Sequence, residues 1–361
     1  MFWEIKMHKY KQSLDDINYF IQTFFCFAAN SEDDFFNKAA FARCFPTCES
    51  GVLKAFTGRS ANAYKFKSAV ENLFKLSYTE QTEIYNAIVN DFDYISGDRT
   101  KFDFSVKKLP RNEREIVHDI FFYFYNEKFG KACGIELNNI DESGINKTQL
   151  KNHFFLANDF VNHVCPVCLS QMSIGKRETH LEHYLPKSIY PALIFHPFNL
   201  YYACNSCNTV YKKAKDTLLN GISLNQIFIP YLEPAVDFTE IIIERANMTD
   251  IVKLKAKDKN TATQNRIDNL NRLFELEERW SSNIECYYGQ FRCSYKDKSI
   301  TRDELKEKLS EQTNYLVARS REFPEKYIES VYMKWIYTRQ LDAFYDSLFT
   351  ETFIEETNKL N

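Results

Sequence analysis

Two Cys-x-x-Cys pairs, Cys165-Pro-Val-Cys168 and Cys204-Asn-Ser-Cys207, constrain this chain more than any other feature of its sequence. Each pair places two thiolates close together, and two such pairs supply the four sulfur ligands of a closed tetrahedral Zn²⁺ site. A redox dithiol is the alternative for a single pair, and chance pairing stays open in a chain with ten cysteines. We expect a structural zinc bound by Cys165, Cys168, Cys204 and Cys207.

The chain is poor in the residues that interrupt helices. Its 361 residues include only nine glycines and nine prolines, about half the share of an average protein. Apolar residues recur at helical spacing before about residue 155 and again after about residue 240, as at Ile267, Leu270 and Leu273. Most of the prolines lie between about 160 and 236, the one section where we expect short strands. We therefore predict a mainly α protein with a helical region at 1–158, a small zinc module at 159–236 and a second helical region at 237–361.

Charge and hydropathy exclude several classes of protein. The formal net charge is −3, so any site for nucleic acid must be a local patch of positive charge. No run of 18 apolar residues occurs, and the most apolar segment, 17–29, is interrupted by Asn18, Gln22 and Thr23, which predicts an amphipathic helix. Two acidic residues precede it where an export signal carries positive charge, so we expect a cytoplasmic protein without a membrane partner. No glycine-rich phosphate loop occurs, which argues against an unaided nucleotide hydrolase.

A second set of polar residues lies between and beside the cysteine pairs. The sequence runs Glu182-His183-Tyr-Leu-Pro186, then Asn199, and nine residues later Asn208. This pattern resembles the HNH endonuclease family, in which an acidic residue and a histidine precede xxP, an asparagine follows, and an asparagine or histidine comes nine residues later. Glu182 and Asn208 stand where aspartate and histidine are commoner in that family.

The resemblance implies a fold and a role for one residue. HNH modules have the ββα-metal fold, a β-hairpin followed by a helix, often braced by a four-cysteine zinc. We expect such a module between the two helical regions. The counterpart of Asn199 in the family holds the loop between the two strands through hydrogen bonds to the backbone, so its role there is support.

The residue types fit phosphodiester hydrolysis on chemical grounds as well. That reaction needs a base to deprotonate water and a cation to stabilise the developing charge. His183 is the only side chain in the set whose ordinary pKa, about 6.5, suits a base at neutral pH. Glu182 and Asn208 offer oxygen ligands, which favour Mg²⁺ or Mn²⁺ as the catalytic cation. We predict a catalytic set of His183, Glu182, Asn199 and Asn208.

Two lysines follow Asn208 at helical spacing. If a helix begins near Asn205, Lys212 and Lys215 lie on the face that carries Asn208. We predict that these two lysines bind the phosphate beside the catalytic cation, with DNA rather than RNA as the expected nucleic acid.

Two short segments after the second cysteine pair suggest a partner. The segments 228–234 and 267–273 are similar to parts of the Septu-type antiphage HNH effectors, which act with an ABC-type ATPase. This resemblance implies a defence nuclease with an ATPase partner, and the many aromatic residues favour a homo-oligomer or a stable complex. The alternative is a zinc-braced protein without catalytic activity that binds nucleic acid or acts as an adaptor.

Overall fold

The computed structural model describes residues 2–48, 54–100, 102–129, 145–158, 164–172, 179–219, 222–246, 249–296, 300–320 and 322–349. Over these residues the protein is mainly helical, as expected, and contains two antiparallel two-stranded sheets. The chain divides into two compact units: residues 1–167 with 173–235, and residues 168–172 with 236–361. The predicted boundary between residues 158 and 159 borders a segment, 159–163, that lies outside the described residues.

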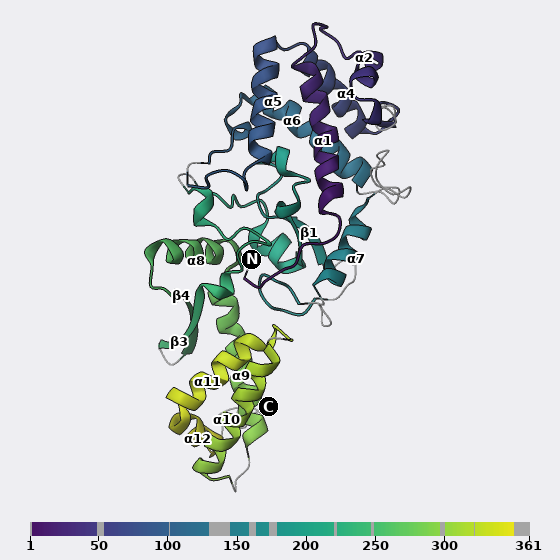
Figure 1. The fold of residues 1–361 in the computed structure, drawn as a ribbon. Helices are drawn as coiled ribbons and strands as arrows, with labels where there is room; N and C mark the ends of the chain where they lie inside the picture. Colours follow the sequence, from purple (N-terminus) through teal and green to yellow (C-terminus); the bar gives the residue numbers. More distant parts are fainter. Residues whose placement is uncertain are drawn as a thin grey trace, which may run out of the picture. The chain divides into compact units, whose positions relative to one another are not determined.

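The first unit begins with a group of helices (Figure 1), and aromatic side chains pack between them. Phe24, in the first of them, is fully buried, and its ring lies 5.2 Å from the ring of Phe41 and 5.7 Å from that of Phe66. Much of the unusual phenylalanine content therefore forms this core. The helices are α1 (Lys11–Ala28), α2 (Lys38–Cys44), α4 (Ala61–Phe74), α5 (Tyr78–Phe92), α6 (Arg111–Tyr123) and α7 (Lys147–Ala157).

The most apolar segment of the chain forms most of α1, as its amphipathic pattern predicted. The buried residues Leu14, Ile17, Ile21 and Phe24 recur at intervals of three and four, which places them on one face of the helix. The buried side chain of Asn18 remains within the helix by donating a hydrogen bond to the backbone oxygen of Leu14, 3.0 Å away. None of the helices in the described residues combines the length and apolar character that a membrane span requires.

A small hairpin follows the helices in the first unit. Strand β1 (Thr179–His183) pairs antiparallel with β2 (Leu200–Cys204), and Glu182 lies opposite Tyr201. The long connection between them contains short 3₁₀ turns, η4 (Pro191–Leu193) and η5 (Pro197–Asn199). After β2 the chain forms a single π-helical segment, η6 (Ser206–Lys212). Two strands and a short helical segment therefore surround the polar motif.

The second unit contains a hairpin that the sequence analysis did not predict. Strands β3 (Thr239–Ala246) and β4 (Thr249–Ala256) pair antiparallel, in a region where we expected the helical pattern to return. Val252, Leu254 and Ala256 are buried and alternate with the lysines at 253 and 255. This period of two is the signal of a half-buried strand, and the residues on either side masked it because they have helical spacing.

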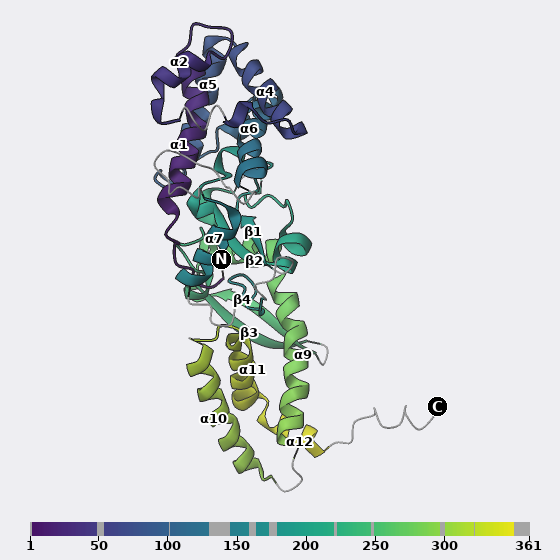
Figure 2. The same cartoon turned by 90° about the vertical axis from the view of Figure 1, so that its right-hand side faces the viewer.

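The rest of the second unit is helical. Helices α10 and α11 pack side by side (Figure 2). Thr301 and Glu304 form a capping box: the backbone N–H of Thr301 donates to Glu304 Oε2 at 2.8 Å, and the N–H of Glu304 donates to Thr301 Oγ1 at 3.3 Å. The helices are α8 (Thr261–Phe274), α9 (Leu276–Tyr295), α10 (Arg302–Ser320), α11 (Lys326–Arg339) and α12 (Leu341–Phe349).

Candidate functional site

The four cysteines of the two pairs come together, as the sequence predicted. All four are buried, and their Sγ atoms lie within 4.8 Å of one another. The Sγ atoms of Cys165 and Cys207 are 3.8 Å apart. This distance matches a tetrahedral Zn–S₄ site, in which Zn–S bonds of about 2.3 Å place the sulfurs about 3.8 Å apart. The cluster therefore has the ligand type, number and spacing of a site for a metal such as zinc.

Backbone N–H groups already point at two of these sulfurs. The N–H of Cys204 donates to Cys165 Sγ and the N–H of Cys207 donates to Cys204 Sγ, each at 3.4 Å. Such bonds stabilise thiolates, the form that binds metal. Cys204 ends β2 and Cys207 lies in η6, so the second pair connects the hairpin to the helical segment.

Asn199 holds the connection between β1 and β2 in place. Its side chain is fully buried and accepts a hydrogen bond from the N–H of Leu185 at 2.7 Å. The amide nitrogen donates to the backbone oxygens of Leu185, at 3.1 Å, and Leu193, at 3.0 Å. One side chain thus satisfies three backbone groups in the loop that follows Glu182 and His183.

Glu182 is buried and paired with a lysine. Its Oε1 accepts a hydrogen bond from Lys212 Nζ at 2.5 Å, and the same ammonium donates to the backbone oxygen of His183 at 2.7 Å. Burial raises the pKa of the Glu182 carboxyl, and the charge of Lys212 opposes that rise. Lys212 therefore binds the carboxylate from within the protein, where we had expected it to face a phosphate.

His183 lies at the end of β1 in a cationic environment. Its Nε2 is 3.0 Å from the backbone oxygen of Ile194, so this nitrogen carries the proton and the lone pair of the neutral ring is on Nδ1. Burial lowers the pKa of His183 well below its ordinary value, and the nearby charge of Lys187 lowers it further. The imidazole is therefore neutral at pH 7 with its lone pair on Nδ1, and its lowered pKa makes it a weaker base than an ordinary histidine.

The helical segment after β2 is shorter than the predicted helix. It ends at Lys212, and Lys213 has a positive φ of 50°, so Lys215 does not continue the face that carries Asn208. Asn208 is half-buried, and within the described residues its side-chain amide has no hydrogen-bond partner. The structure therefore brings Glu182, His183 and Lys212 together. Lys215 lies outside the helical segment that contains Lys212.

Sequence reasoning missed two lysines and a tyrosine beside His183. The ring of Tyr125, in the π-helical segment η3 (Phe124–Phe129), packs edge-on against the imidazole at 4.9 Å between centroids. Lys147, the first residue of α7, and Lys187, four residues after His183, both lie over the Tyr125 ring. Lys187 adjoins Pro186 of the motif, but nothing in the local pattern connects it with Lys147, 40 positions earlier.

No protein-family model matches this chain, and no curated protein or solved structure matches it. Function has to be inferred from the site itself. The site offers a neutral imidazole, a buried carboxylate, several lysines and an amide that has no hydrogen-bond partner among the described residues, a set that suits proton transfer beside a bound anion.

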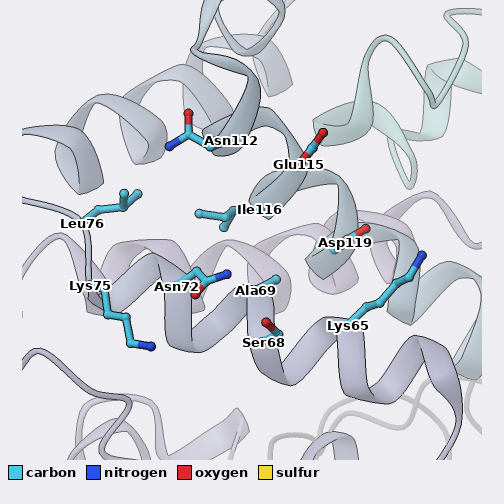
Figure 3. A pocket seen from close by; sticks show the side chains of 10 residues that line it. All are labelled: Lys65, Ser68, Ala69, Asn72, Lys75, Leu76, Asn112, Glu115, Ile116 and Asp119. Carbon is cyan, nitrogen blue, oxygen red and sulfur yellow. The ribbon is translucent and has the colours of Figure 1, made fainter.

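A separate hollow of about 430 Å³ lies between α4 and α6 (Figure 3). Its lining mixes the lysines at 65 and 75 with Glu115, Asp119 and the apolar Ile116. None of the predicted site residues lines it. This hollow is therefore separate from the predicted site.

Proposed function

We propose that this protein is a metal-dependent endonuclease of the HNH type that hydrolyses phosphodiester bonds in nucleic acid, DNA rather than RNA. The observation that carries the proposal is the position of Glu182 and His183 at the end of β1, in a hairpin whose second strand leads through the four-cysteine cluster into η6. A hairpin followed by a helical segment is the arrangement that a ββα-metal module requires. Zinc at the cysteines would be structural, since four thiolates leave no open coordination position.

In this proposal His183 is the general base. The hydrogen bond from Nε2 to the backbone oxygen of Ile194 fixes the ring orientation and leaves Nδ1 to accept the proton of the attacking water. Asn199 keeps the loop that contains Ile194 in register with the strand, because it binds the backbone on both sides of the loop.

Glu182 and Asn208 are the side chains that would hold Mg²⁺ or Mn²⁺. Lys212 occupies Oε1 of Glu182, which leaves Oε2, and the amide oxygen of Asn208 has no partner among the described residues. Both are hard oxygen ligands of the kind these cations prefer. When bound, the cation would stabilise negative charge on the phosphate and on the leaving oxygen.

A protein that binds nucleic acid or acts as an adaptor without catalysis is the alternative. The ion pair between Glu182 and Lys212 favours it, because a carboxylate already neutralised by a lysine has less affinity for a cation. A catalytically silent protein, however, has no need for a neutral, oriented imidazole at His183.

Plasmid nicking separates the two functions. We expect the wild type to nick supercoiled plasmid with Mg²⁺ or Mn²⁺ and to stop when EDTA removes the weakly held cation. His183→Gln should keep a donor to Ile194 and lower the nicking rate by about a hundredfold or more, because it removes the base. His153→Gln, on α7, is the matched control and should nick at the wild-type rate. If the wild type is inactive with both cations, alone and with its partner, the adaptor function replaces the nuclease.

We further propose a cytoplasmic role in antiphage defence with an ABC-type ATPase partner, or as a homo-oligomer. The support is the similarity of segments 228–234 and 267–273 to Septu-type effectors, together with the reduced state that a four-thiolate site requires. Co-expression with the ATPase from a neighbouring gene should give a stable complex. A strict monomer in light scattering, unchanged by the ATPase, would remove this part of the proposal.

A further inference from the structure

Two ammonium groups meet at one aromatic ring beside His183. Lys147 Nζ lies 3.7 Å from the centroid of the Tyr125 ring, and Lys187 Nζ lies 4.3 Å from the same centroid. Tyr125 is almost fully buried and packs edge-on against the imidazole of His183. A rigid ring therefore fixes two cations next to the candidate base, although they come from parts of the chain 40 residues apart.

Neither lysine forms an ion pair among the described residues, although the charge of the Glu182 carboxylate acts on Lys187. Other lysines of this unit are paired: Lys107 with Asp216 at 2.8 Å and Lys212 with Glu182 at 2.5 Å. Lys147 also stands at the first position of α7, where the helix dipole disfavours positive charge. Two like charges at one ring and at a helix N-terminus are an unfavourable arrangement unless an anion joins them.

The pKa values of both lysines are lowered, mainly because their ammonium groups are partly buried. Burial lowers the pKa of Lys147 to about 8, and the charge of Lys187 contributes to the decrease. Burial also lowers the pKa of Lys187, and the negative charge of the Glu182 carboxylate partly offsets this decrease. A bound anion would reverse both effects because it stabilises the protonated forms.

We propose that Lys147 and Lys187 bind a backbone phosphate of the nucleic acid next to the bond that is cut, with Tyr125 as the platform that positions both ammonium groups. This inference rests on the proposed nuclease function and assigns the phosphate contacts to residues outside the HNH motif. The two lysines take the role that the sequence suggested for Lys212, whose ammonium is committed to Glu182.

The surroundings of Lys187 extend the positive surface. The next residue, Ser188, lines a hollow of about 330 Å³ together with Arg114 and with Lys107 and Arg111, which pair with Asp216 and Glu115. Among the described residues Arg114 forms no ion pair, so a nucleic-acid strand that passes Lys187 would meet its guanidinium next, and contacts to successive phosphates are the usual source of affinity for nucleic acid.

The test is binding of a fluorescein-labelled 20-base-pair DNA duplex to the full chain in EDTA, followed by fluorescence anisotropy. K147M/K187M keeps the apolar stems on Tyr125 and removes both charges. We expect about tenfold weaker binding at 0.1 M NaCl and a decrease of about 1 in the slope of log K against log [NaCl], because the two lysines share one phosphate contact. K147R/K187R keeps both charges and should bind within about twofold of the wild type.

A control pair accounts for net charge. K65M/K75M makes the same change in charge on exposed lysines of the hollow in Figure 3 and should leave affinity and slope unchanged. Equal weakening by both pairs, or wild-type binding by K147M/K187M with normal zinc content and melting temperature, would overturn the inference. Nicking is measured separately with Mg²⁺. If the wild type binds DNA through these lysines but does not cut it, the nuclease function is refuted. If K147M/K187M cuts with an unchanged KM, only the phosphate site is refuted.

Discussion

The ammonium of Lys212 lies 2.5 Å from the carboxylate of Glu182, and both side chains are buried. A pair of this kind contributes little net stability compared with an apolar pair, but removal of one partner leaves an uncompensated charge in the interior. The residue that we expected to face a phosphate thus holds the candidate metal ligand in position.

Lys212→Met should lower the free energy of unfolding by about 3–5 kcal/mol because Glu182 loses its counter-charge. The double variant E182Q/K212M should recover most of that loss. Chemical denaturation of the single and double variants provides the measurement, and equal stabilities of K212M and E182Q/K212M would contradict the ion-pair assignment.

The same pair predicts how stability depends on pH. Because the pKa of Glu182 is raised in the folded state, the folded protein binds the proton more tightly than the unfolded chain does. The contribution of this group to stability is present below the ordinary pKa of 4.5 and is lost as the pH rises through the folded pKa. K212M should steepen that loss as the pH rises above 4.5, and E182Q should abolish it. Denaturation midpoints measured across this range decide the matter.

The four-cysteine cluster predicts that metal binding and folding are linked. Cys207→Ser should lose the bound metal and destabilise the first unit, since binding of a structural zinc by four thiolates contributes on the order of 10 kcal/mol. Cys286→Ser, at an exposed cysteine, is the control and should keep about one zinc per chain. Elemental analysis together with thermal melting tests this, and full zinc with unchanged melting in Cys207→Ser would eliminate the site.

Binding of DNA should weaken as the pH rises through about 8. Lys147, with a pKa of about 8, loses its proton in this window, and burial lowers the pKa of Lys187 as well, which acts in the same direction. The pKa of Tyr125 is raised and that of His183 is lowered, so both rings stay uncharged between pH 7 and 9. K147R/K187R should show no such decrease, because arginine keeps its charge. Anisotropy titrations at pH 7, 8 and 9 compare the two proteins, and parallel curves would count against a role for Lys147.

Asn199 predicts a large effect from a small substitution. Asn199→Asp keeps the acceptor for the N–H of Leu185 but replaces the group that donates to the oxygens of Leu185 and Leu193. We expect it to lower the free energy of unfolding by about 2–4 kcal/mol, since buried carbonyls lose their partners. Asn208→Asp, at a half-buried amide with no partner among the described residues, should change stability by less than about 1 kcal/mol. Urea denaturation of the two variants gives the comparison.

Local spacing predicted some features of the molecule well. The two Cys-x-x-Cys pairs and α1 are each defined by residues within a few positions of one another, where backbone geometry dictates which side chains meet. The strands β3 and β4 carried an alternating pattern but lay beside stronger helical patterns. The approach of Lys147 to Lys187 depends on tertiary packing around Tyr125, which no periodicity encodes.

Lys212 is a single residue for which prediction from local spacing failed. Helical spacing from Asn208 suggested a solvent-facing lysine, but the segment is π-helical and ends at that residue. Widening of the turn changes which positions share a face, so a prediction based on 3.6 residues per turn fails there.

The separation of the two cysteine pairs along the chain has a consequence for how the protein reaches its fold. Cys165 and Cys204 are 39 residues apart, so a cation held by both pairs closes a long loop in any conformation that retains it. A covalent link across such a loop would lower the conformational entropy of the denatured ensemble, which corresponds to about 4 kcal/mol of free energy at 25 °C. Metal bound early in synthesis would therefore reduce the number of conformations open to the chain between the pairs. This segment includes the strand that ends in Glu182 and His183, so it would be restricted before either side chain forms its native contacts.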